Sequence, residues 1–162
     1  MKVLIKVGMA DLNVAGREES LRSTGLGSCV GVALFDPRVK VAGLAHVMLP
    51  QSSIAVGKEI NKAKFADTAI PELIRLMQEK GAKAECMVGK LAGGSQMFTL
   101  GNREDTIRIG PRNVETCKAI LQQYGIPITA EDTGGNYGRT IELDGSTGIL
   151  HIRSVQHGSR EI

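Results

Sequence analysis

Two apolar runs separated by a short turn constrain the fold of this chain more than any other feature. Residues 29–36 (Cys-Val-Gly-Val-Ala-Leu-Phe-Asp) and residues 39–49 each have the length and composition of a buried strand. The segment Asp36-Pro37-Arg38 has turn chemistry, because proline presets φ at the second position of a turn. The sequence therefore predicts a buried β-hairpin over residues 29–49.

Two further segments have the periodicity of amphipathic helices. In residues 62–79 apolar side chains recur at helical spacing, and Gly81 follows as a C-terminal cap. Pro71 lies inside this segment and is expected to kink or divide the helix. A second helix is predicted over residues 111–124, with proline at its start and glycine after its end. Its predicted apolar face consists of Val114, Cys117, Leu121 and Tyr124.

Strand candidates fill most of the remaining chain: residues 3–7, 85–91, 126–129, 139–143 and 149–155. Asp144-Gly145 begins a predicted hairpin turn between the last two. A chain of 162 residues is long enough for one domain and short for two. The pattern therefore predicts a single domain, residues 1–162, of the α/β (α+β) class, which at this size folds without metal or disulfide staples.

Composition excludes several classes of protein. Aromatic residues make up 3% of the chain and tryptophan is absent, so the sequence offers no platform for stacking bases. The net charge is only +3, and lysines and arginines are scattered, which argues against a nucleic-acid partner. No apolar run is long enough to span a bilayer, and no signal peptide is recognisable. We therefore expect a cytoplasmic protein with free thiols and no membrane insertion.

The three cysteines differ in their surroundings. Cys117 lies on the apolar face of a predicted helix, and Cys86 opens a predicted apolar strand, so both are interpreted as core residues. Cys29 instead follows the glycine-rich segment Gly25-Leu26-Gly27-Ser28, where a sharp turn can present converging N–H groups. A thiol nucleophile needs such donors for the oxyanion of its tetrahedral intermediate. We therefore predict that Cys29 is a nucleophile and that Gly27 and Ser28 form its oxyanion turn.

A nucleophilic thiol also needs a base within hydrogen-bond reach. A turn centred between Pro37 and Arg38 pairs Cys29 directly with His46, which places both side chains on one face with Cβ atoms about 5 Å apart. His46 is therefore the predicted base, the alternative being a buried core histidine. Without Cys29 opposite it, a lone histidine in an apolar strand is more often a buried core residue that is hydrogen-bonded.

A third group usually orients the imidazole of such a pair. The hydroxyls of Ser23 and Thr24, just before the glycine-rich turn, are both candidates, and either can instead be a simple turn residue.

Several weaker patterns carry no assigned cofactor or metal. Residues 25–31 have the spacing GxGxxxG and precede a strand-like run, which is not a dinucleotide-binding loop. Glu131 and Asp132 beside two glycines are interpreted as a solvated turn rather than as metal ligands. Met97 and Phe98 are predicted to form either an exposed patch for a partner or part of the core.

The combined motifs resemble the CheD family of chemoreceptor glutamine deamidases. The resemblance rests first on Gly25-Leu26-Gly27-Ser28-Cys29-Val30 followed by Ala45-His46-Val47-Met48-Leu49-Pro50. Further matching segments follow in order: Lys64-Phe65-Ala66-Asp67-Thr68-Ala69, Leu91-Ala92-Gly93-Gly94, Ile109-Gly110-Pro111-Arg112-Asn113-Val114 and Ala130-Glu131-Asp132-Thr133-Gly134-Gly135-Asn136.

The resemblance implies a cytoplasmic, cofactor-free hydrolase that converts glutamines on chemoreceptor signalling helices to glutamates. It also implies that the protein binds and stimulates the phosphatase CheC. The implied fold is like the cysteine hydrolase domain of deamidating toxins, with mixed β-sheets packed together and flanking helices. The family's nucleophile and base map onto Cys29 and His46. The family has a threonine six positions before the cysteine, where this chain has Ser23, so Ser23 and the adjacent Thr24 both stay candidates for the third role.

Two other functions are compatible with the same residues. In a non-catalytic adaptor, the site would only dock receptor or phosphatase helices, and the Cys29 thiol would be dispensable. In a protease or another thiol hydrolase, the same pair would act on a different substrate. Redox sensing by Cys29 is less favoured, because no resolving cysteine lies nearby in the sequence.

Overall fold

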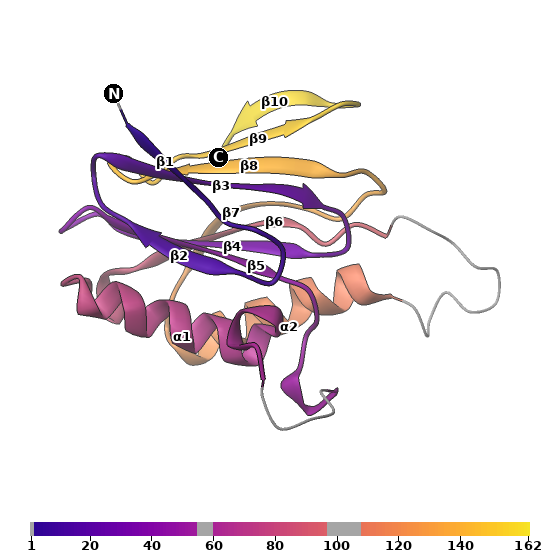
Figure 1. The fold of residues 1–162 in the computed structure, drawn as a ribbon. Helices are drawn as coiled ribbons and strands as arrows, with labels where there is room; N and C mark the ends of the chain where they lie inside the picture. Colours follow the sequence, from indigo (N-terminus) through magenta and orange to yellow (C-terminus); the bar gives the residue numbers. More distant parts are fainter. Residues whose placement is uncertain (1, 55–59, 97–107) are drawn as a thin grey trace.

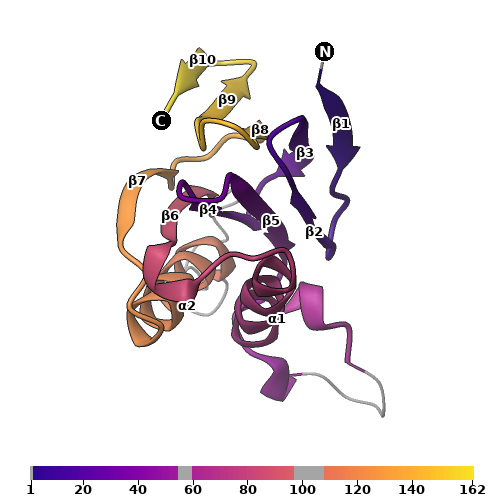
Figure 2. The same cartoon turned by 90° about the vertical axis from the view of Figure 1, so that its left-hand side faces the viewer.

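The chain folds into three layers, two β-sheets stacked on each other and a layer of two helices (Figure 1). A computed structural model describes residues 2–54, 60–96 and 108–162. Both helices cover the same face of one sheet, while the other sheet lies on its opposite face, as the turned view in Figure 2 makes clear.

The upper sheet in Figure 1 has the strand order β1-β3-β8-β9-β10, and the sheet next to the helices has the order β2-β5-β4-β6-β7. The strands of the upper sheet are β1 (Val3–Lys6), β3 (Glu19–Leu26), β8 (Arg139–Asp144), β9 (Leu150–Ser154) and β10 (Gly158–Glu161). Those of the helix-facing sheet are β2 (Leu12–Ala15), β4 (Val30–Asp36), β5 (Val41–Val47), β6 (Val88–Gly93) and β7 (Ile128–Thr133).

Each sheet is mixed, because β1 runs parallel to β3 and β6 runs parallel to β7, while the other pairs are antiparallel. The helices are α1 (Ala66–Glu79) and α2 (Ile109–Gln123), and short 3₁₀ turns occupy Ser52–Ile54, Lys62–Lys64 and Ala84–Cys86. The predicted α/β (α+β) class, with mixed sheets packed together and flanking helices, is confirmed.

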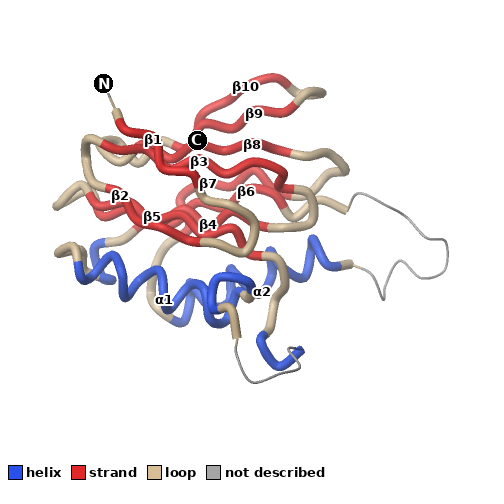
Figure 3. Tube along the Cα trace, viewed as in Figure 1, coloured by secondary structure: helices blue, strands red, loops and turns tan. Residues whose placement is uncertain are grey.

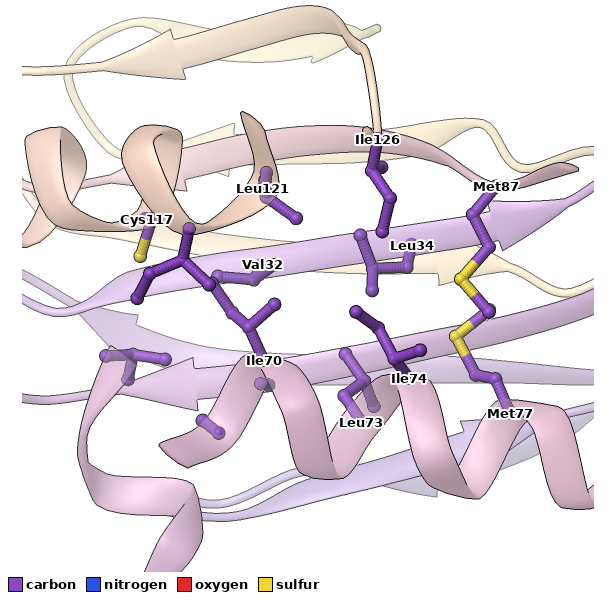
Figure 4. Close-up of a cluster of buried hydrophobic side chains, with 14 of the residues drawn as sticks. Val32, Leu34, Ile70, Leu73, Ile74, Met77, Met87, Cys117, Leu121 and Ile126 are labelled. Atoms are coloured by element: carbon purple, nitrogen blue, oxygen red, sulfur yellow. The ribbon is translucent and has the colours of Figure 1, made fainter. Parts of the chain in front are cut away.

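The first core lies between the helices and their sheet (Figure 4). Alternate residues of β4, Val32 and Leu34 among them, point toward the helices, as the period of a strand requires. From α1, Ile70, Leu73 and Met77 meet them, and the Met77 side chain lies beside that of Met87 in Figure 4. The helical spacing read from the sequence is therefore the buried face of α1.

The second core lies between the two sheets and uses the opposite faces of the same strands. Ala33 and Phe35 of β4 and Leu44 of β5 pack against Ile141 and Leu143 of β8. The helix-facing sheet is therefore buried on both faces, which explains why all residues of β4 and β5 are buried.

The hairpin forms, but its predicted register is wrong. Asp36 pairs with Val41, and Gly31, not Cys29, lies directly opposite His46. The loop contains four residues rather than two, because Lys40 adopts a positive φ of 57° and donates its N–H to the carbonyl of Asp36. The longer loop shifts each cross-strand pair by two residues relative to the prediction.

Differences also appear in the helices. Pro71 does not divide the first helix, which begins at Ala66 and continues through it to Glu79. The segment Lys62–Lys64, predicted as helix, is a separate 3₁₀ turn. In α2 the side chain of Tyr124, predicted on the apolar face, is exposed because it follows the last helical residue.

The sequence did not reveal β2, β3 or β10, which appear as red tubes in Figure 3. Strand β3 lacks a continuous apolar run and includes part of the predicted glycine-rich turn. Met97 and Phe98 lie outside the described residues. No helix within residues 2–54, 60–96 and 108–162 has the length and apolar composition needed to cross a membrane.

Candidate active site

Cys29 and His46 face the layer between the two sheets. Cys29 immediately precedes β4 and packs with the inter-sheet core, and only 7% of its surface is exposed. His46 is fully buried and lies directly opposite Gly31. Cys29 is two residues before Gly31, so its side chain is on the same face of the sheet as that of His46. The two residues are therefore diagonal rather than direct neighbours, a separation that side chains can still bridge.

Because residue 31 is a glycine, no side chain stands directly opposite His46. A Cβ atom built at this position would lie 2.3 Å from Cδ1 of Ile141 in the other sheet. The glycine therefore lets the two sheets approach closely beside the histidine.

Ser23 is hydrogen-bonded to the imidazole ring of His46. Its Oγ lies 2.7 Å from Nδ1 of His46 and also 2.7 Å from the carbonyl oxygen of Val7. Since the hydroxyl proton goes to the carbonyl, Oγ accepts a hydrogen bond from a protonated Nδ1. This network assigns the neutral tautomer in which Nε2 is unprotonated and can act as a base.

Thr24 does not share this position. It follows Ser23 on β3, so its side chain points to the opposite face of the strand, and the residue is exposed. Of the two candidate hydroxyls, Ser23 is the one that meets His46, while their catalytic roles stay predictions.

Burial keeps both members of the pair neutral at rest. It lowers the pKa of the His46 imidazole below 6.5. It also raises the pKa of the Cys29 thiol above 9.0, an effect that the residue's own backbone N–H partly offsets by hydrogen bonding. Nε2 of His46 is buried and has no hydrogen-bond partner among residues 2–54, 60–96 and 108–162. An unprotonated, unpartnered nitrogen of this kind is available to accept a proton.

The turn before Cys29 is held by hydrogen bonds to three successive carbonyl groups. Ser95 donates its backbone N–H to Gly27 at 2.8 Å, and Gly94 donates its own to Cys29 at 2.8 Å. The carbonyl of Ser28 between them accepts from a side chain of α2, described below. With every carbonyl fixed, the peptide planes of the turn cannot rotate freely.

The predicted oxyanion turn is thus a defined structure, and its donors can be distinguished. The N–H of Gly27 is directed to the carbonyl of Gly25 at 3.1 Å, whereas the N–H of Cys29 lies beside its own thiol. Gly93, with a φ of 101°, allows the segment after β6 to approach the turn, because a Cβ there would lie 2.3 Å from the carbonyl oxygen of Cys29. The roles of Gly27 and Ser28 in oxyanion binding stay predictions.

The other cysteines and the acidic pair have different surroundings. Cys117 is fully buried in α2, and burial raises the pKa of its thiol to about 12. Cys86 lies in a 3₁₀ turn and not, as predicted, in a strand. Asp132, interpreted as part of a solvated turn, instead lies within β7 and forms a buried ion pair with Arg139 at 3.0 Å.

Asn113 is the residue of this region that sequence reasoning missed. It is fully buried in α2, and its Nδ2 donates to the carbonyl oxygens of Ser28 at 3.0 Å and Met48 at 2.9 Å. The available signal was its spacing, because Asn113, Cys117 and Leu121 recur every four residues on the buried face of the helix. A polar residue at such a position requires an explanation.

The arrangement provides a thiol, a base of defined tautomer and a fixed turn in one buried location. These are the groups that acyl transfer through a covalent thioester needs. Within the described residues, no group of three or more His, Cys, Asp or Glu side chains is placed to hold a metal ion.

Comparison with known proteins identifies close relatives. Residues 48–154 match the family model described as CheD chemotactic sensory transduction, a match that begins after His46. The chemoreceptor glutamine deamidase CheD of Halalkalibacterium halodurans is 50% identical over 162 residues, which cover 100% of both chains. The protein of the same name from Bacillus subtilis is 47% identical over 160 residues, 99% of this chain and 96% of that one.

Among solved structures, the hypothetical protein YfiH of Bacillus licheniformis matches with a TM-score of 0.49 and 14% identity. The match covers 76% of this chain and 50% of that protein, so this chain spans about half of its length.

The family model covers more than half of the chain, and relatives that are about half identical match it from end to end. The chain therefore belongs to the CheD family of chemotactic sensory transduction proteins.

Proposed function

We propose that this protein hydrolyses the side-chain amides of specific glutamines on the cytoplasmic helices of chemoreceptors, leaving glutamates. Cys29 is the nucleophile, His46 the general base and acid, and Ser23 the residue that orients His46. The observation that carries the proposal is the buried Ser23–His46 hydrogen bond, which leaves Nε2 of His46 unprotonated in the layer that also holds the Cys29 thiol. The names of the full-length relatives support the same substrate.

The first half of the reaction forms a thioester. The S–H bond of Cys29 breaks as Nε2 of His46 takes the proton, and Sγ forms a bond to the carboxamide carbon of the substrate. Negative charge develops on the carbonyl oxygen, and the backbone N–H of Cys29 stabilises it by hydrogen bonding. The C–N bond then breaks, and the leaving ammonia takes the proton from His46.

The second half regenerates the thiol. A water molecule gives a proton to Nε2 of His46, and the resulting hydroxide attacks the thioester carbon. The C–S bond breaks, Sγ recovers the proton from His46, and the glutamic acid formed gives its proton to the released ammonia, so the products are glutamate and ammonium. One water is consumed and one ammonia released, so the reaction needs no cofactor. Conversion of a neutral amide to a carboxylate changes the charge of the receptor helix, which can bias signalling.

Two further parts of the proposal rest on the family resemblance. We place the activity in the cytoplasm, where a reducing environment keeps the nucleophilic thiol free. We also propose that the protein binds the phosphatase CheC and stimulates its activity. Titration of CheC with the purified protein tests this, and absence of saturable binding would remove CheC from the list of partners.

Mass spectrometry of a receptor cytoplasmic fragment tests the reaction. The fragment is incubated with the wild type, with Cys29→Ala and with Cys117→Ala, which removes a buried thiol outside the site. We expect conversion of particular glutamines to glutamates by the wild type and Cys117→Ala, and none by Cys29→Ala. A trapped covalent adduct on Cys29 would support the thioester directly.

The same experiment separates the competing functions. A non-catalytic adaptor predicts receptor binding without conversion by any variant. A protease predicts new peptide termini in place of changed glutamines. Equal conversion by the wild type and Cys29→Ala would refute the proposed nucleophile.

A further inference from the structure

Asn113 connects the two strand ends that carry the candidate catalytic pair. Ser28 immediately precedes Cys29 at the start of β4, and Met48 directly follows the last residue of β5, two positions after His46. The Nδ2 group of Asn113 donates one hydrogen bond to each of their carbonyl oxygens, at 3.0 and 2.9 Å. Two acceptors on one side of the amide fix which of its ends is the NH₂ group.

The hydrogen bond to Ser28 also determines where the N–H of Cys29 points. The carbonyl of Ser28 and the N–H of Cys29 belong to one planar trans peptide, so they point in opposite directions. With the carbonyl held toward α2 by Asn113, the N–H is directed away from the helix. It acts on the Cys29 thiol, whose pKa burial raises and this N–H partly lowers.

The position of Asn113 is itself fixed by close packing of α2 against the segment after β6. A Cβ atom built on Gly110 would lie 2.2 Å from the carbonyl oxygen of Ser95, and one on Gly94 would lie 2.3 Å from Cγ2 of Val114. Gly94 and Ser95 are the residues whose N–H groups hold the carbonyls of Cys29 and Gly27. The helix and the turn are therefore held as one unit.

The burial of the Asn113 side chain is energetically unfavourable. The residue is fully buried, and its Oδ1 has no hydrogen-bond partner among the described residues, a situation that an apolar side chain would avoid. Its neighbours on the same helix face, Cys117 and Leu121, are apolar core residues. The two hydrogen bonds that its NH₂ group donates, rather than packing, therefore explain an asparagine at this position.

We infer that Asn113 is a positioning residue, which holds the Ser28–Cys29 peptide with its N–H toward the reacting thiol and ties that peptide to the strand of His46. This inference rests on the proposed function. Asn113 organises the oxyanion site but does not touch the substrate.

Two variants of Asn113 and one matched control test this role. Asn113→Leu keeps nearly the same volume and removes both donors, whereas Asn113→Ser keeps one hydroxyl donor. Cys117→Ala lies one turn along on the same buried face and perturbs the packing of α2 without touching the turn. The readouts are kcat and KM for the receptor fragment and the pH dependence of Cys29 alkylation, followed by peptide mass mapping.

For Asn113→Leu we expect kcat to fall about 100-fold with KM changed less than about threefold, because misplaced catalytic groups affect mainly the transition state. The midpoint of Cys29 alkylation should move to higher pH, because the N–H no longer favours the thiolate. For Asn113→Ser, both kcat and the alkylation midpoint should lie between those of the wild type and Asn113→Leu. If Asn113→Leu does not fold, Asn113→Ser takes its place in the test. Cys117→Ala should keep kcat within about threefold.

Two results would overturn the inference. One is wild-type kcat and alkylation behaviour in a folded Asn113 variant. The other is an equal loss in Cys117→Ala, which would indicate general packing of α2. If the wild type does not convert glutamine at all, the proposed function fails, but the alkylation profiles still decide whether Asn113 positions the Cys29 peptide.

Discussion

The Oγ atom of Ser23 lies 2.7 Å from Nδ1 of His46, although the two residues are 23 positions apart and belong to different sheets. The contact crosses the inter-sheet layer and also engages the carbonyl of Val7. It gives the buried histidine a defined tautomer, protonated at Nδ1. The stacking of the two sheets therefore brings these two side chains together.

The first prediction concerns this hydrogen bond. Ser23→Ala should lower kcat roughly ten- to a hundredfold, a part of the 10²–10⁴ that a positioned base contributes. Ser23→Thr keeps the hydroxyl and should retain most of the rate. Thr24→Val alters an exposed side chain on the other face and serves as the control. Steady-state kinetics with the receptor fragment measures all three, and a Ser23→Ala enzyme as fast as the wild type would contradict the orienting role.

The second prediction concerns pH and stability. Burial lowers the pKa of His46 in the folded state, so the unfolded state binds a proton more readily. The free energy of unfolding is therefore undiminished above about pH 6.5 and falls below it, by at most about 1.4 kcal/mol per pH unit. Urea denaturation of the wild type and His46→Gln across this range measures the difference. Parallel pH profiles for the two proteins would show that His46 is not responsible.

The third prediction concerns the close approach of β6 to the turn. Gly93→Ala places a Cβ against the backbone carbonyl of Cys29, which cannot move without breaking its bond to Gly94. We expect the positive φ to lower the free energy of unfolding by about 1–2 kcal/mol and the clash to lower it by a further 1–3 kcal/mol. Activity should be lost as well. Gly125 has a φ of 68°, and a Cβ there would have no atom within 4 Å, so Gly125→Ala should lose only the stability that the positive φ costs. Equal urea midpoints for the two variants would rule out the proposed clash.

The fourth prediction concerns the buried ion pair of Arg139 and Asp132. Arg139→Met should destabilise the fold by about 3–5 kcal/mol, because it leaves a carboxylate without its main partner. Arg160 also contacts Asp132, at 3.2 Å, but its side chain is 60% exposed, so Arg160→Met should cost less than about 1 kcal/mol. The double variant Arg139→Met/Asp132→Asn should recover part of the loss in urea denaturation. No recovery would mean that the cost arises from packing instead.

The sequence was most informative where local pattern determines structure. The helical spacing of α1 from Ala66 to Met77 and the two central apolar strands are local properties, and all are observed as predicted in kind. The glycine-rich context of Cys29 and the proximity of His46 in the next strand were likewise visible. The element boundaries and the hairpin register were less secure, because a single residue at positive φ, Lys40, changes the loop length.

Long-range contacts were not readable from one sequence. The choice between Ser23 and Thr24 depended on which face of β3 turns toward the other sheet, and β3 itself has no strong strand pattern. The ion pair of Asp132 required knowing that β7 continues through that residue and that Arg139 lies beside it.

The amino-acid sequence by itself determined the fold class, the two amphipathic helices and the candidate pair Cys29 and His46, because each follows from periodicity, turn chemistry or residue type within a short segment. Only the tertiary structure decided that this pair is diagonal, that Ser23 is hydrogen-bonded to the histidine and that Asn113 is hydrogen-bonded to the carbonyl of Ser28. The reason is physical: these relations depend on how two sheets and a helix stack, and stacking is set by many distant contacts acting together.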